Sequence, residues 1–229
     1  MMVRRRRRLG IAAAVAAVAA SVTAGSALLL MPSKPTQAQG GGVGLTPAEV
    51  NTILDQAQAG ANSVRSALRG PGNQPTRMHI AVVARDGRLL GIRSMPDAWV
   101  GSLDIAVAKA RTGAFFSSNQ NALTSRVLGD LSEAHSGPNK ESNEAGPLWG
   151  IWASNQQGIS GGPQTRNGII TFPGGLPLYK NGQLVGGIGV SGDAVDPDEA
   201  VAFDGAAGFR PPAAIPQPGY TRPSVNPFP

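Results

Sequence analysis

The chain has 229 residues and a formal net charge of +6, from 20 basic and 14 acidic residues, and it has no cysteine. Residues 1–38 hold six of the basic residues and no acidic one, so the remainder carries 14 of each and is neutral. A neutral domain lacks the basic patch that nucleic-acid binding requires, so we expect no nucleic-acid partner. The absence of cysteine excludes disulfides, thiolate metal sites and a cysteine nucleophile.

Residues 1–38 have the form of an export signal. Five arginines at 4–8 precede an uncharged, Ala-rich run over residues 9–31, and a polar stretch with the letters "PTQAQG" follows. We predict a signal peptide cleaved after Ala38 and a domain outside the cytoplasm, either periplasmic or secreted. The uncharged run is also long enough to span a bilayer, so a retained signal anchor that tethers the protein to the membrane is the alternative.

Residues 39–44 read as a flexible Gly-rich joint before a single domain at 45–208. Thr46, Pro47 and Glu49 fit a capping box, which predicts a helix from there to about Arg69. The next segment, "HIAVVARDGRLLGIRS", reads as two strands around an Asp-Gly turn.

The second half of the domain continues with helices, a long loop and strands. A helix is predicted from Ser102 to about Phe116. A polar passage at 117–168 follows, which carries Trp149 and Trp152 and in which a short helix is predicted over 125–131. Strands are predicted at "GIITF" and in a hairpin around Asn181-Gly182, and a last helix is predicted from an Asp196 cap to Gly208. This order predicts an α+β domain.

The final segment, residues 209–229, is rich in proline. Its composition favours a disordered tail, and the alternative is a polyproline segment that binds a partner.

Gly187, Gly189 and Gly192 spell the GxGxxG motif of dinucleotide-binding folds. The alternating residues around them predict a strand that continues through the motif, and no helix follows directly, so the motif lacks its required setting. Glycines on one face of a strand let another group approach the backbone closely. A packed helix is the simpler interpretation, and a flat ligand is the alternative.

Three segments resemble the GlcG/HbpS haem-binding family, which includes the C-terminal domain of PduO-type proteins. They are "HIAVVARDGRLLGIRSMPDA", "SLDIAVAKARTGAFF" and "FPGGLPLYKNGQLVGGIGVSGDAVDPDEAVA". The resemblance implies a profilin-like fold of α/β/α layers with a five-stranded antiparallel sheet. It also implies haem binding and a homo-oligomer, and in some members haem degradation or redox sensing.

Under that resemblance, the two histidines of the domain, His79 and His135, are the first candidates for the haem iron ligand. His79 is preferred over His135 because it begins an apolar strand. The simpler interpretation of His79 is a half-exposed residue at a strand end that binds no haem. Met78, Met95 and Tyr179 are weaker candidates. Haem b held without covalent attachment is expected, because no C-x-x-C-H motif is present.

Other residues are candidates for contacts with the porphyrin. Lys109 and Arg111 could pair with the propionates, or could be solvated helix residues or cap partners. Phe115 and Phe116 could lie against the ring, or could be core residues. Gly187 and Gly189 are the residues that a flat ligand would approach.

No catalytic or metal site is predicted. The acidic cluster lacks the spacing of an EF-hand loop, and helix-start chemistry accounts for two of its members; it comprises Asp193, Asp196, Asp198 and Glu199. No G-x-S-x-G nucleophile motif is present in the sequence.

The leader predicts an exported protein, and the resemblance implies that it binds haem for sequestration, transport, degradation or redox sensing. A binding protein is favoured over an enzyme, with weak haem degradation as an additional activity. Two alternatives stay open: a structural or interaction module of the same fold that binds no haem, and a binder of small carboxylates, which the glycolate-locus members of the family suggest.

Overall fold

The computed structural model describes residues 43–70, 73–132, 134–135, 144–145 and 168–229. The leader and the passage with Trp149 and Trp152 lie outside these residues. Val43–Pro229 form one unit, separate from Met1–Gly42.

The first helix of the described residues, α2 (Pro47–Ser63), begins at the predicted capping box. Glu49 N–H donates to the Thr46 hydroxyl, and the Glu49 carboxylate accepts from Thr46 N–H at 2.8 Å. The helix ends at Ser63, earlier than predicted, because Val64 is extended and forms a bridge with Pro227 of the tail.

Two predicted hairpins form one antiparallel sheet in the order β2-β1-β6-β5. In the first, β1 (His79–Ala84) and β2 (Leu89–Ser94) join through a turn with Gly87 at φ +79°. In the second, β5 (Gly175–Lys180) and β6 (Gln183–Ser191) join through Asn181 and Gly182, both at positive φ. Such φ values are typical of short hairpin turns. Strand β6 runs through Gly187 and Gly189, as the alternation predicted.

The described sheet has four strands, so the five-stranded profilin-like sheet stays a prediction. The predicted strand at "GIITF" is wrong: residues 168–172 are not in a strand. Here Ile170 exchanges hydrogen bonds with the Thr112 hydroxyl, and this side-chain contact takes the place of strand pairing. Two short strands, β3 (Ala134–His135) and β4 (Glu144–Ala145), form a separate pair.

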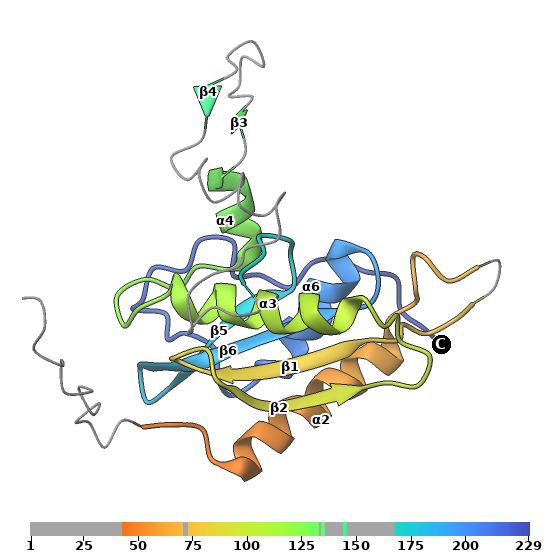
Figure 1. Ribbon diagram of the computed structural model, residues 1–229, viewed down its shortest axis with the longest axis horizontal. Helices are drawn as coiled ribbons and strands as arrows, with labels where there is room; N and C mark the ends of the chain where they lie inside the picture. The colour runs from red at the N-terminus through yellow and green to blue at the C-terminus, as the bar shows by residue number, and fades with distance from the viewer. Residues whose placement is uncertain (1–42, 71–72, 133, 136–143, 146–167) are drawn as a thin grey trace, which may run out of the picture. The chain divides into compact units, whose positions relative to one another are not determined.

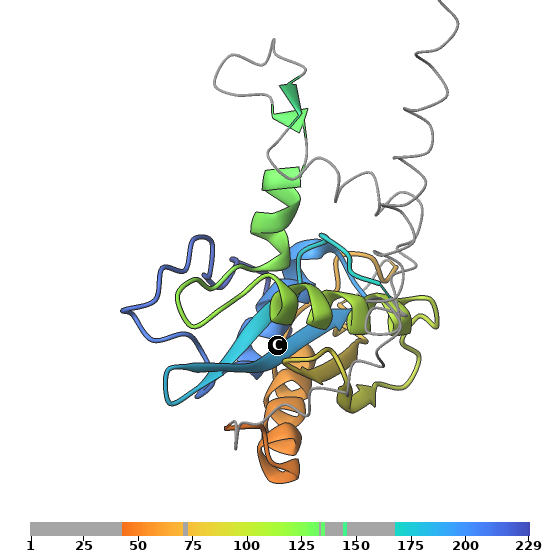
Figure 2. The same cartoon turned by 60° about the vertical axis from the view of Figure 1, so that its left-hand side comes forward.

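Helices lie on both faces of the sheet (Figures 1 and 2). Helix α3 (Ser102–Phe115) packs on β1, β5 and β6, whereas α2 packs on β1 and β2 from the other face. Helix α6 (Val195–Gly205) lies beside α2 and begins after an extended Ala194, not at an Asp196 cap. A short helix, α4 (Ser125–Ser132), contacts α3 and β5. No helix within the described residues is long and apolar enough to cross a membrane.

The Pro-rich tail packs against the domain, so the disorder predicted for 209–229 is corrected. Tyr220 is 6% exposed and joins the main core, where its hydroxyl donates to the Pro177 carbonyl. Phe228 N–H donates to the Ser63 carbonyl at 2.7 Å. Composition predicted disorder because proline cannot join a helix or a central strand, but apolar anchors and backbone bonds hold this segment in place.

Candidate functional site

Gly187 and Gly189 lie beneath α3, so no ligand reaches them. A Cβ at Gly189 would overlap the Ala106 carbonyl oxygen, and one at Gly187 would overlap that of Ala110. The packed-helix interpretation of the glycine face is therefore correct, and the flat-ligand alternative is excluded for these two residues.

Lys109 forms a buried ion pair instead of reaching a propionate. Its side chain is 2% exposed, and its Nζ donates to Asp198 Oδ2 at 2.7 Å and to the Val190 carbonyl at 3.0 Å. Burial lowers the pKa of Lys109 and raises that of Asp198. The neighbouring Glu199 accepts from Arg126 of α4 at 2.5 Å. These charges join α3, α4 and α6, so Lys109 is corrected to a structural residue.

Arg111, Phe115 and Phe116 also have structural roles. Arg111 Nε donates to the Gly87 carbonyl at 3.0 Å, and burial lowers its pKa. The Phe115 ring lies directly over Gly87 at the β1–β2 turn and packs against the core under α3. Phe116 closes α3 by donating its N–H to the Thr112 carbonyl. The three residues hold the end of α3 against the hairpin.

The weaker ligand candidates are core residues. Met78, Met95 and Tyr179 are at most 4% exposed. The Tyr179 hydroxyl donates to the Ser118 carbonyl at 2.7 Å, and burial raises the pKa of this tyrosine to about 12. His135 belongs to β3, but its side chain lies outside the described residues.

The residues of the acidic cluster form hydrogen bonds and ion pairs with other groups of the protein. Asp193 accepts from the Ser66 hydroxyl and from Ala67 N–H, and Asp196 accepts from Arg126. Within the described residues, no group of three or more His, Asp or Glu side chains is placed to hold a metal ion.

His79 is 5% exposed, and both of its ring nitrogens are hydrogen-bonded. Nε2 lies 3.0 Å from the Trp99 carbonyl oxygen, and Nδ1 lies 2.8 Å from Ser94 Oγ. Because a carbonyl can only accept, the proton is assigned to Nε2, and Nδ1 then accepts from the Ser94 hydroxyl. Both ring nitrogens therefore have a hydrogen-bond partner in this arrangement.

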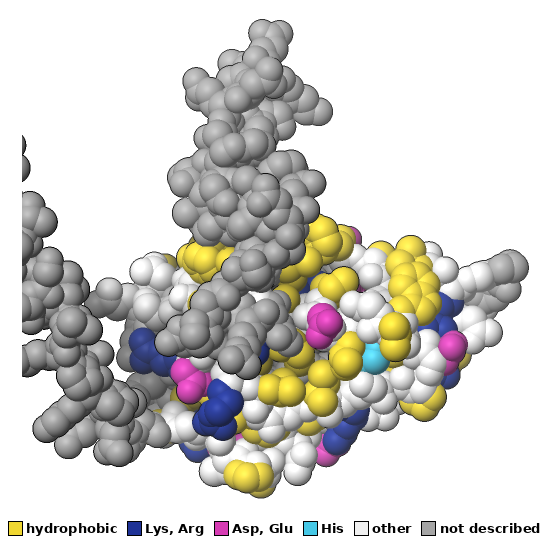
Figure 3. Space-filling model, viewed as in Figure 1, with side chains coloured by type: hydrophobic (Ala, Val, Ile, Leu, Met, Phe, Trp, Pro, Cys, Tyr) yellow, Lys and Arg dark blue, Asp and Glu magenta, His cyan; other side chains and the backbone are white. Residues whose placement is uncertain are grey.

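The loop that contacts His79 exposes large apolar side chains. Trp99 is 49% exposed and Val100 is 87% exposed, between the end of β2 and the start of α3. Figure 3 shows hydrophobic side chains gathered on this side of the domain, with a histidine among them. Arg69 holds the same loop through Asp97 at 2.5 Å. We call His79, Ser94, Trp99 and Val100 the His79 corner.

The sequence identified His79 but missed Ser94 and Trp99. A two-residue turn at Asp86-Gly87 would also place Ser94 opposite His79, but the observed turn joins Ala84 to Arg88, and an irregularity in the pairing between Val82 and Val83 restores that register. Trp99 had no comparable signal, because it lies in a loop whose path is set by tertiary contacts.

Comparisons with known proteins identify relatives of this domain. The model of the family described as "Haem degrading protein HbpS-like" matches residues 53–207. An uncharacterised 15.0 kDa protein from the dhaT-dhaS intergenic region of Citrobacter freundii is 31% identical over 122 residues, which is 53% of this chain and 68% of that protein. The corrinoid adenosyltransferase PduO of the same organism is 29% identical over 123 residues, 54% of this chain but only 29% of PduO.

Solved structures share the fold. Klebsiella pneumoniae ORFY superposes with a TM-score of 0.52 at 25% identity, covering 74% of this chain and 93% of that one. A complex of PduOC with haem superposes with a TM-score of 0.51 at 23% identity, covering 72% and 94%. The family match spans most of the described domain, and the chain therefore belongs to the HbpS-like family of haem-degrading proteins.

Proposed function

We propose that this chain binds haem b without covalent attachment at the His79 corner, with His79 as the iron ligand. The observation that carries the proposal is a single hydrogen bond: the one between His79 Nε2 and the Trp99 carbonyl, in a loop that exposes a tryptophan and a valine. Family membership and the haem complex of PduOC support haem as the ligand.

His79 can become a ligand by moving one proton. If the proton moves from Nε2 to Nδ1, Nδ1–H can donate to Ser94 Oγ, because a hydroxyl accepts as well as donates. Nε2 then presents a lone pair, and Ser94 orients the ring as the outer partner of a metal-binding histidine does.

The Trp99 carbonyl does not lose its only partner in this change, because it also accepts from Ser102 N–H at 2.9 Å. Displacing it from Nε2 therefore costs about 1 kcal/mol, the net value of one hydrogen bond. The exposed Trp99 ring offers an aromatic surface on which a porphyrin can stack. Bound haem would supply an iron centre for ligand or redox chemistry.

Arg77 is the cation proposed for a propionate. It lies two residues before His79, and its side chain has no ion pair within the described residues, unlike Lys109.

The test is a haemin titration of the full-length chain, followed through the Soret band. His79→Gln is the informative variant, because its amide can donate to the Trp99 carbonyl and accept from Ser94 but ligates iron poorly. We expect wild type to give a saturable shift, His79→Gln to lose it, and the control His135→Gln to keep it. A normal shift in His79→Gln would move the ligand elsewhere, and no shift in wild type would favour the interaction module.

Haem degradation is tested with the same samples. Loss of the Soret band of the wild-type complex on addition of ascorbate in air, and its retention in free haem controls, would assign degradation to the chain. A stable band would assign binding alone.

We also propose that the domain acts outside the cytoplasm. The support is the order of five arginines, an uncharged run and a polar stretch in residues 1–38. N-terminal sequencing of the protein recovered from the source cells tests this: a start at Gln39 supports cleavage, and an intact start supports the anchor.

A further inference from the structure

The turn between β1 and β2 carries two arginines and one acidic residue, in the sequence Arg85-Asp86-Gly87-Arg88. Arg88 Nε lies 3.9 Å from Asp86 Oδ2, so these two charges offset each other. Arg85 is exposed, and its side chain has no hydrogen bond or ion pair within the described residues. The turn therefore keeps one positive charge without a partner.

Arg111 of α3 brings a second unpaired cation to the same turn. Its Nε donates to the Gly87 carbonyl, but its Nη1 is buried and has no hydrogen-bond partner. Burial lowers its pKa, and no carboxylate in the described part of the chain forms an ion pair with it. A guanidinium keeps its charge in proteins, so this half-buried charge is uncompensated. The Gly87 carbonyl needs only one donor, so this contact does not require a charged one.

Arg85 and Arg111 lie near the same end of α3. The Tyr179 hydroxyl donates to the Ser118 carbonyl, just after that helix. Burial raises the pKa of Tyr179, and the positive charge of Arg85 acts against this effect, which places Arg85 near the segment that follows α3. Figure 3 shows Lys and Arg side chains gathered around one acidic side chain at this end of the sheet. We call Arg85 and Arg111 the arginine pair.

The tip of the second hairpin adds no free acidic group to this end of the sheet. The register of β1, β6 and β5 places Lys180 at the same end as Ala84. Lys180 binds Glu49 of α2 at 2.7 Å. The charge of Glu49 is therefore already matched, and the arginine pair needs a partner from outside the chain.

We propose that the arginine pair binds a phosphate monoester. Two unpaired cations match the charge of about −1.5 to −2 that such a group carries at neutral pH. The planar fork of a guanidinium also fits two phosphate oxygens at once. A monocarboxylate or a phosphodiester would neutralise only one of the two cations. The site lies at the opposite end of β1 from His79, and it does not depend on haem.

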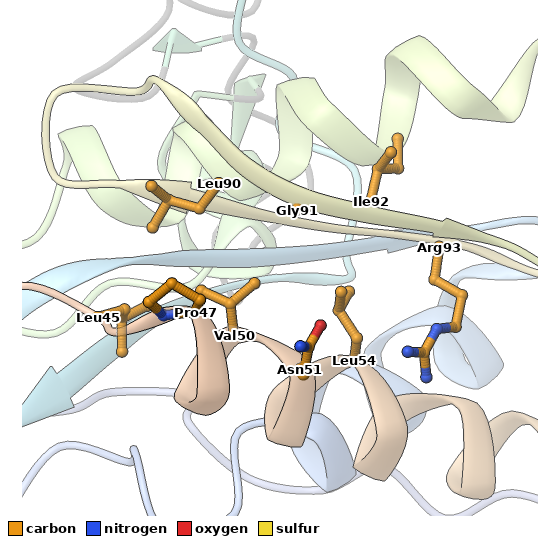
Figure 4. A pocket seen from close by; sticks show the side chains of 9 residues that line it. All are labelled: Leu45, Pro47, Val50, Asn51, Leu54, Leu90, Gly91, Ile92 and Arg93. Atoms are coloured by element: carbon orange, nitrogen blue, oxygen red, sulfur yellow. The ribbon is translucent and has the colours of Figure 1, made fainter.

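The groove between α2 and β2 lacks such a free charge. It has a volume of about 290 Å³, with Val50 and Leu54 on its wall and Arg93 at one end (Figure 4). Arg93 is already paired with Asp55 of α2. Removing Arg93 takes one positive charge from the same hairpin and leaves the arginine pair intact. It is therefore the matched control for Arg85.

The first test follows the melting temperature of the full-length chain as glycerol 3-phosphate is added at constant ionic strength. We expect the ligand to stabilise wild type, and its dissociation constant to rise about tenfold in Arg85→Gln. Arg93→Gln should respond like wild type. Residues 1–38 carry further arginines in all three proteins, so only the difference between the variants reports on the site. No stabilisation of wild type, or an equal change in both variants, would overturn the proposal.

A second variant tests Arg111 without removing its charge. Arg111→Lys keeps a cation and a donor for the Gly87 carbonyl but loses the guanidinium fork. We expect it to bind glycerol 3-phosphate more weakly, whereas its melting temperature without ligand stays close to that of wild type. Binding as tight as in wild type would exclude Arg111 from the site.

Two further probes separate a phosphate monoester from other anions. Dimethyl phosphate carries the single charge of a phospholipid headgroup diester, and malonate carries two carboxylates. We expect both to stabilise wild type less than glycerol 3-phosphate does at the same concentration. A stronger effect of dimethyl phosphate would assign the arginine pair to a membrane surface, and an equal or stronger effect of malonate would assign it to a dicarboxylate. Either result would overturn the proposal.

Discussion

The two faces of the sheet are packed by different kinds of side chain. Under α3, Gly187 and Gly189 of β6 pack against Ala106 and Ala110 of the helix, so the backbone of the strand contacts the backbone of the helix. Under α2 and α6 the contacts are made by large aliphatic side chains, including Ile53, Ile80, Leu178 and Ile188.

This difference explains which face of the sheet tolerates substitutions. On the α3 face the helix position is set by backbone contact, and no flexible side chain can move aside. On the α2 and α6 face, side chains can adjust. Because α3 covers β1, β5 and β6, Ile92 of β2 and Trp99 and Val100 of the His79 corner stay exposed.

The largest effect is expected at Lys109, which fixes α3 to α6 through Asp198. Lys109→Met leaves a buried carboxylate without its cation, and we expect the free energy of unfolding to fall by about 3–5 kcal/mol. Burial raises the pKa of Asp198 to about 6 from 3.8, so its folded form binds the proton more tightly than its unfolded form. Lys109 lowers the pKa of Asp198, so its removal raises this pKa further, and the loss should shrink as the pH falls from neutral towards about 6.

Urea unfolding at several pH values measures this effect. The double variant Lys109→Met with Asp198→Leu removes both charges and should recover much of the loss. A single variant that unfolds like wild type would mean that α3 is held by the glycine contacts alone.

The next largest effect is expected at Gly189. Gly189→Val places a branched side chain against the Ala106 carbonyl, and we expect a loss of about 3 kcal/mol in a thermal or urea melt. Gly101→Ala is the control, since a Cβ at Gly101 meets nothing within 4 Å. Equal stability of the two variants would contradict close packing of α3.

A smaller effect is expected on the opposite face. Ile80 is fully buried in the cluster under α2 and α6, and Ile80→Val removes one methylene there. We expect a loss of about 1 kcal/mol in the same urea melts. A loss larger than that of Gly189→Val would reverse the contrast between the two faces.

The smallest effect is expected at the start of α2. Hydrogen bonds from Lys180 and from Thr46 lower the pKa of Glu49 to about 2 from 4.5. A lowered carboxyl pKa contributes stability above its unfolded value, and this stability is lost as the pH falls from about 4.5 towards 2. Glu49→Gln should therefore show a weaker acid dependence than wild type across that range, measured by urea midpoints. If both proteins lost stability equally as the pH falls, Glu49 would not contribute to the acid dependence of stability.

Local features of the sequence predicted much of the fold. Thr46 and Glu49 lie three residues apart and cap α2 as expected. The Asp86-Gly87 and Asn181-Gly182 turns predicted both hairpins, but the pairing of His79 with Ser94 also depends on an irregularity in the first hairpin between Val82 and Val83. The site was predicted less well: of the proposed haem contacts, Lys109, Gly187 and Gly189 have structural partners instead.

By itself, the sequence determined the features that depend on neighbours within a few residues: helix caps, hairpin turns, strand alternation and the neutral charge of the domain. Tertiary structure decided the features that join distant segments. Lys109 meets Asp198 across 89 positions, His79 contacts the loop at Trp99, and Tyr220 of the tail enters the core. The physical reason is that a buried charge or polar group is stable only beside a partner, and which partner it meets depends on how the helices and strands pack.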